Sequence, residues 1–172
     1  MRKPSVSELL EIMAKPALIP WANKMGLKGV DISTYSKKKM ADGTSIHSQI
    51  QYGAFDNEED AIAYSRFMSD KICLCQEQEI ETDWFVGRYD AMLSVNGDKF
   101  IVDYKRGYKG KLYIENKLQL IAYTMAEPAR MAIVGVPKFV LHEFVPANRG
   151  HYEEIIKSLY NIWAMLRETR HD

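Results

Sequence analysis

The chain has 172 residues, 47% of them hydrophobic and 27% charged, and its 23 basic and 23 acidic side chains give a formal net charge of +0. This length and composition predict a single globular domain, residues 1–172, with a hydrophobic core. The neutral charge excludes nucleic-acid binding through a global positive field, so any such contact must use local basic patches. No apolar run approaches the roughly 18 residues of a membrane-spanning helix, and no membrane partner is expected.

The N-terminal residues and the cysteines indicate the cellular compartment. The opening sequence MRKPSVSELLEIM has neither the apolar region nor the cleavage site of a signal peptide, so none is expected. Cys73 and Cys75 are one residue apart, a spacing that does not suit an ordinary disulfide. On a strand both thiols would share a face, where burial in the core is favoured over metal binding. We therefore expect a cytoplasmic protein.

In the first half of the chain, the apolar periodicity predicts helices separated by polar segments. Ser5 or Ser7 is the expected N-cap of the first helix, Thr44 of the second and Asn57 of the third. Lys15-Pro16 should end the first helix. Helices are expected at residues 7–15, 45–52 and 58–71. Irregular segments are expected at residues 16–29, with one possible helical turn, and at residues 31–39.

The second half predicts most of the sheet. A strand is followed by a hairpin, a helix that Pro128 stops, two further strands and a last amphipathic helix. Strands are expected at residues 72–80, 84–105 (the hairpin), 131–136 and 139–145, helices at 113–127 and 150–169. This order predicts an α/β fold with a mixed sheet of about five strands flanked by helices.

The hairpin carries the most informative residues of the chain. Asn96-Gly97 favours a two-residue type I′ turn that pairs Val95 with Asp98. The same register places Asp90 directly opposite Asp103, on one face of the sheet. Lys105 follows Asp103 by two residues and lies on that face too.

Two acids placed opposite each other destabilise a sheet unless something compensates their charge. A divalent cation between Asp90 and Asp103 would do so, because hard cations prefer carboxylate oxygens. The alternative interpretation is a solvated face on which Lys105 screens the two acids. For the D…DxK pattern alone, that alternative is the favoured one.

Three further residues carry little information individually. Gln119 and Tyr123 are four residues apart on a predicted helix and can point at one site, but such a pair could equally be half-exposed surface. His47, beside an apolar stripe, is more often a structural histidine than a ligand. The other histidines have no metal-ligand spacing to it.

Taken in order, these residues form a pattern. Gly43-x-x-x-His47, Gly87-x-x-Asp90, Asp103-Tyr104-Lys105 and Gln119-x-x-x-Tyr123 resemble the RecB-like branch of the PD-(D/E)xK nucleases. The resemblance spans about residues 43–123, and the flanks resemble small phage-type or mitochondrial-genome-maintenance-type exonucleases. Tyr89 stands where the family name has proline, a substitution common in this branch.

The resemblance implies a restriction-endonuclease-like core and a role for each motif residue. The implied metal ligands are the side chains of His47, Asp90 and Asp103 and the carbonyl of Tyr104, with Mg²⁺ or Mn²⁺ as the cofactor. Lys105 would position or activate the attacking water, Gln119 would orient Lys105 or the water, and Tyr123 would support this group or touch the DNA backbone. Some relatives hold an iron–sulfur cluster with four cysteines, and two cysteines cannot build one.

The expected function is therefore metal-dependent exonucleolytic hydrolysis of linear DNA, in DNA repair or recombination in a bacterial or phage-infected cell. The expected partners are DNA ends, with single strands favoured, and a recombination or replication protein. Two alternatives remain: a structure-selective endonuclease on the same core, and a non-catalytic DNA-binding or assembly module. The candidate DNA-binding residues, suited to phosphates or to base stacking, are Trp84, Arg88, Arg106, Lys109 and Lys111.

Overall fold

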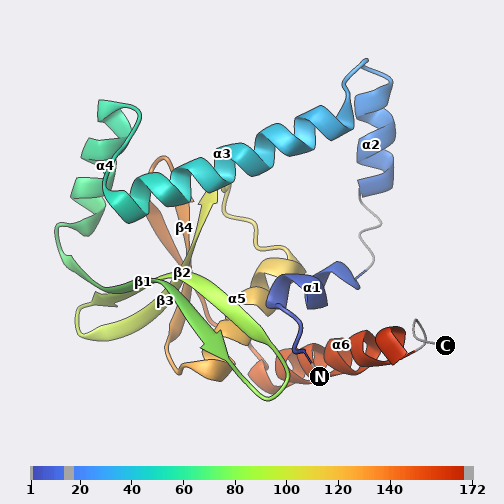
Figure 1. Ribbon diagram of the computed structural model, residues 1–172. Helices are drawn as coiled ribbons and strands as arrows, with labels where there is room; N and C mark the ends of the chain where they lie inside the picture. Colours follow the sequence, from blue (N-terminus) through green and yellow to red (C-terminus); the bar gives the residue numbers. More distant parts are fainter. Residues whose placement is uncertain (1, 14–17, 169–172) are drawn as a thin grey trace.

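A mixed five-stranded sheet forms the centre of the computed structural model, which describes residues 2–13 and 18–168 (Figure 1). Strands β3 and β4 run parallel, and the other neighbouring strands run antiparallel. Helices cover both faces, so the expected α/β class with a mixed sheet of five strands is confirmed. The elements are α1 (Val6–Glu11), α2 (Leu18–Gly26), α3 (Ile32–Tyr52), α4 (Glu58–Met68), β1 (Lys71–Glu81), β2 (Val86–Val95), β3 (Asp98–Arg106), α5 (Ile114–Ala126), β4 (Arg130–Val136), β5 (Val140–Phe144) and α6 (Arg149–Glu168).

The predicted hairpin is present as β2 and β3. Asn96 has φ 53° and Gly97 φ 88°, the two positive values that a type I′ turn requires. The ladder follows the expected register from the turn as far as the pair Ala91–Val102. It ends there, one pair before Asp90 and Asp103, so the prediction that these two acids form a ladder pair is wrong.

The two faces of the sheet have separate hydrophobic cores. Helices α1, α5 and α6 cover one face, where Leu9, Leu118 and Ile121 are among the buried residues. Helices α3 and α4 cover the other face, through Ile46 and other buried residues such as Ile50 and Phe67. Alternate residues of β3 therefore face different helices, which places Tyr104 on the α3 side and its neighbours Asp103 and Lys105 on the α5 side.

Residues 18–52 are more helical than predicted, whereas α1 and α4 are shorter than the predicted helices 7–15 and 58–71. One continuous helix, α3, replaces the expected polar segment and short helix, and Asp31 rather than Thr44 caps it through the N–H groups of Ser33 and Thr34. The expected loop before it contains α2. Figure 1 shows α2 and the first half of α3 projecting away from the sheet. Neither core includes a described side chain of this part, and the polar start of α3 has no apolar stripe that could predict a helix.

Other local predictions had mixed outcomes. Ser5 caps α1 with a complete capping box, and Asn57 caps α4, as expected. The predicted end of the first helix at Lys15-Pro16 lies outside the described residues. Cys73 is exposed and Cys75 half-buried, with a register shift between them, so the expectation that both thiols are buried is wrong. None of the helices in the described ranges has an apolar stretch that could span a membrane.

Candidate active site

Asp90 lies where strands β2 and β3 separate. Its Oδ2 accepts a hydrogen bond of 2.7 Å from the backbone N–H of Tyr104, the donor that lies just beyond the last ladder pair. The carboxylate is therefore held in place by the backbone of the neighbouring strand. Burial raises the pKa of Asp90 to about 7, and the nearby carboxylate of Asp103 contributes to the rise.

His47 reaches the same place from α3. The buried residues Ile46 and Ile50 press this helix onto the sheet, and His47 lies beside them at its edge. Its Nε2 is 3.0 Å from the carbonyl oxygen of Tyr104, and its Nδ1 is 3.4 Å from Oδ1 of Asp90. The structure thus brings three of the four groups predicted as metal ligands into contact.

Asp103, the fourth predicted ligand, is paired with Lys105. The side chain of Asp103 is almost completely buried, and the Lys105 ammonium lies 2.9 Å from its Oδ2. Within the described residues this oxygen accepts no well-aligned hydrogen bond, so the contact is an ion pair. Burial raises the pKa of Asp103, and the charge of Lys105 opposes that rise.

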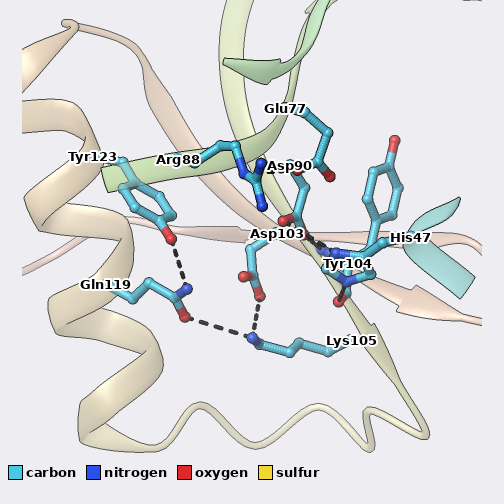
Figure 2. Close-up of polar contacts among 9 residues, drawn as sticks. All are labelled: His47, Glu77, Arg88, Asp90, Asp103, Tyr104, Lys105, Gln119 and Tyr123. Atoms are coloured by element: carbon cyan, nitrogen blue, oxygen red, sulfur yellow. Dashed lines mark hydrogen bonds and ion pairs between the residues drawn. The ribbon is translucent and has the colours of Figure 1, made fainter. Parts of the chain in front are cut away.

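Helix α5 completes a polar chain on this side of the sheet (Figure 2). Lys105 Nζ donates to Gln119 Oε1 at 3.5 Å, and Gln119 Nε2 donates to the Tyr123 hydroxyl at 2.8 Å. Tyr123 is buried, and burial raises the pKa of its hydroxyl. The predicted pair of positions on one helix face therefore points into the site, with Tyr123 buried and Gln119 half-buried.

Gly87, the glycine of the Gly87-x-x-Asp90 pattern, allows this side of the site to close. A Cβ at this position would lie 3.1 Å from Val6 Cγ2 and 3.3 Å from Tyr123 Cε1. Both contacts are tighter than usual packing distances, so a larger residue would push Val6 and Tyr123 a few tenths of an ångström away from β2.

Two residues around Asp90 were not predicted as parts of the metal site. Among the described residues, the His, Cys, Asp and Glu side chains whose ligand atoms lie within 4.8 Å of one another are His47, Asp90 and Glu77 of β1. Glu77 Oε2 also pairs with Arg88 Nε at 3.1 Å, and Figure 2 shows this pair beside Asp90. Arg88 was expected to bind DNA, but no sequence pattern distinguishes Glu77 from the other polar residues of β1.

The site has the groups that a hard divalent cation requires. Carboxylate and backbone carbonyl oxygens suit Mg²⁺. Mn²⁺ accepts these oxygens and also an imidazole nitrogen. Burial raises the pKa of Asp90 and of Asp103, so two ionised acids at this place need compensating positive charge. A cation among His47, Asp90 and Asp103 would supply it. The donor set therefore fits the expected metal.

The predicted DNA-binding residues are spread along one edge of this site and beyond it. Arg106 is exposed at the end of β3 and lines a cavity of about 310 Å³ beside Lys105, His47 and α3. Lys109 lines a separate cavity with Tyr108, and the ammonium of Lys111 lies over the ring of Tyr113. Arg88 and Arg106 thus adjoin the catalytic candidates, whereas Lys109 and Lys111 lie in the following loop.

Trp84 does not line the site described above. It is half-buried against the core on the α6 side, and the Lys157 ammonium lies 4.9 Å from its ring centroid. Tyr108, another candidate for base stacking, packs its ring against His142. Both rings already have partners within the protein.

Comparisons with known proteins leave the family unassigned. No family model matches the chain, and no curated protein matches it. One similar solved structure is named "Crystal structure of SSO0001". It shares 15% sequence identity over 94% of this chain and 76% of that chain, with a TM-score of 0.47.

Proposed function

We propose that this protein is a metal-dependent deoxyribonuclease that hydrolyses phosphodiester bonds from the ends of linear DNA. The observation that supports the proposal most is that His47 and Asp90 contact each other and the backbone of Tyr104, while the residues on either side of Tyr104, the buried Asp103 and Lys105, form an ion pair. The buried Asp103, the half-buried Asp90, a lysine and an imidazole in one place are groups suited to phosphodiester hydrolysis. The proposal also rests on the resemblance of the motifs to RecB-like nucleases of the restriction-endonuclease-like fold.

The protein's own groups have separate tasks in this reaction. A water oxygen forms a new bond to phosphorus and gives up a proton to solvent, the P–O ester bond breaks, and the leaving oxygen takes up a proton from solvent. The ammonium of Lys105, fixed between Asp103 and Gln119, can donate to a phosphate oxygen as negative charge develops there. Tyr123 holds Gln119, which in turn limits where Lys105 can point.

The cation would be held by His47, Asp90, Asp103 and the carbonyl of Tyr104. When bound, Mg²⁺ or Mn²⁺ lowers the pKa of a water and polarises the phosphate. Asp90 is kept in position for this role by the Tyr104 N–H, and its burial favours exchange of a proton for a metal ion.

The charge distribution supports DNA as the substrate. We call α2 and residues 27–43, which include the start of α3, the arm. The arm carries five lysines and only two acids, although the whole chain is neutral. Four of these lysines, Lys24, Lys28, Lys37 and Lys38, are exposed. Because α3 leads from the arm to His47, phosphates bound along it would approach the site.

The decisive experiment uses linear and closed circular DNA, each single- and double-stranded, with Mg²⁺, Mn²⁺ or EDTA. We expect linear DNA to be degraded to short products with either metal, no degradation in EDTA, and intact circles. Asp90→Asn should be inactive. Glu79→Gln, which removes an exposed carboxylate from the neighbouring strand, should be as active as the wild type.

Other outcomes would separate the alternatives. Rapid nicking of closed circles would favour the structure-selective endonuclease. DNA binding without cleavage under every metal condition would favour the non-catalytic module. Cleavage that continues unchanged in Asp90→Asn would overturn the assignment of the site.

A further inference from the structure

Asp90 lies between two ion pairs formed by its neighbours. Lys105 pairs with Asp103 on one side, and Arg88 pairs with Glu77 on the other. Asp90 stands between them with the Tyr104 N–H and His47 as its partners. Lys105 already pairs with Asp103, whereas the ligand atoms of His47 and Glu77 lie close to those of Asp90 on the other side.

The position of Glu77 fits a ligand on this side. Its carboxylate lies within 4.8 Å of ligand atoms of both His47 and Asp90. Its backbone has φ 49°, a left-handed conformation that is unusual for a non-glycine residue within a strand. The strand pairs on either side, Gln76–Ala91 and Gln78–Tyr89, keep one register. The bend is therefore local to Glu77.

Arg88 is the competitor for the same carboxylate. Its Nε lies 3.1 Å from Glu77 Oε2, and its side chain is 61% exposed compared with 22% for Glu77. The exposed guanidinium can move into solvent, whereas the more buried carboxylate has less freedom. An exposed ion pair of this kind contributes little to stability, so a divalent cation can replace it.

We infer that Glu77 is an additional ligand of the cation site and that Arg88 competes with the cation for its carboxylate. This inference rests on the proposed function and deepens it, since it adds a residue from β1 that none of the motifs contains. It also predicts that metal binding breaks the Arg88–Glu77 pair.

The test measures Mn²⁺ binding by calorimetry, without DNA, so that it does not depend on activity. Glu77→Gln should weaken Mn²⁺ binding about 10-fold or more, within the range seen for residues that support metal ligands. Glu77→Asp, which keeps the charge on a shorter side chain, should bind with intermediate affinity. Glu81→Gln, which removes an exposed carboxylate of the same strand that pairs with Lys3, is the matched control and should bind as the wild type does.

A double-mutant cycle isolates the competition. Arg88→Gln should tighten Mn²⁺ binding several-fold in the wild type, because the carboxylate of Glu77 becomes free. In the Glu77→Gln background the same change should have almost no effect. An equal gain in both backgrounds would mean that Arg88 acts through general electrostatics, and it would overturn the competition.

Mn²⁺ binding by Asp90→Asn and Glu77→Gln distinguishes a wrong ligand assignment from a wrong cation site. If Asp90→Asn abolishes Mn²⁺ binding while Glu77→Gln leaves it unchanged, Glu77 is not a ligand but the cation site stands. If neither variant changes Mn²⁺ binding, the cation site itself is wrong, and the nuclease proposal fails with it. Circular dichroism of each variant verifies that a lost affinity is not a lost fold.

Discussion

The backbone N–H of Tyr104 donates a hydrogen bond to Oδ2 of Asp90 at the point where β2 and β3 part. A side chain thus takes the place that a backbone carbonyl would occupy if the ladder continued. This replacement fixes Asp90 on one strand relative to Asp103 on the other. The carbonyl of the same residue, Tyr104, faces His47.

Stability without metal should fall as pH rises, because of Asp90. Its pKa is about 7 in the folded protein and near the ordinary 3.8 when unfolded. The stabilisation from holding this proton is full below about pH 4 and is lost as pH rises through 7. The difference between the folded and unfolded pKa values of Asp90 corresponds to a change of about 4 kcal/mol in the free energy of unfolding.

This change is measured by urea unfolding in EDTA between pH 4 and 8, for the wild type and Asp90→Asn. In Asp90→Asn the free energy of unfolding should decline much less between pH 4 and 8, because an amide does not titrate. Mn²⁺ should restore stability to the wild type at pH 8. An identical pH profile in both proteins would show that Asp90 is not the group responsible.

Lys105→Ala should lose catalysis but keep metal and DNA binding. Its ammonium acts on charge that develops during the reaction, so we expect a loss of about 10²–10⁴ in kcat. Gln119→Ala should lose less, because Gln119 acts through Lys105. Lys99→Ala removes an exposed lysine from the same strand and serves as the control.

Single-turnover cleavage at saturating DNA, together with Mn²⁺ calorimetry, separates the effect of Lys105→Ala on catalysis from its effect on binding. If Lys105→Ala abolished DNA binding and kept the rate at saturating DNA, the lysine would be a phosphate anchor. The proposed role in the transition state would then be wrong.

Two glycine substitutions should have opposite effects on stability. Gly87→Ala forces Val6 and Tyr123 away from β2 and should destabilise the fold by about 1–3 kcal/mol. Gly43→Ala places a methyl group in open space inside helix α3 and should stabilise it by about 0.5–1 kcal/mol. Urea unfolding measures both. A stabilising Gly87→Ala would contradict the close packing described at this position.

The arm should contribute phosphate contacts without sequence preference. Lys37→Gln/Lys38→Gln should lower the slope of log affinity against log salt by about 0.7 per lysine on single-stranded DNA. Lys99→Gln should leave the slope unchanged. Fluorescence anisotropy with a labelled oligonucleotide between about 50 and 200 mM salt measures the slope. An unchanged slope in the double variant would exclude the arm from the DNA path.

The sequence by itself determined which segments form most of the sheet and on which face most of the motif residues lie. Asn96-Gly97 specifies a local turn, and a turn propagates its register along two strands, so Asp103 and Lys105 could be placed on one face. The spacing of Gln119 and Tyr123 likewise needed only helix geometry. These inferences succeed because each depends on contacts between neighbours in the chain.

Tertiary structure decided what depends on contacts between distant segments. Only the packing of α3 on the sheet brings His47 to Asp90, and only the local bend in β1 brings Glu77 beside them. The continuous α3 was also hidden, because a helix that projects into solvent needs no apolar stripe. The depth of burial of Asp103, which raises its pKa, arises where β3 pairs with β4 and packs against α5. No local pattern in the sequence encodes that environment.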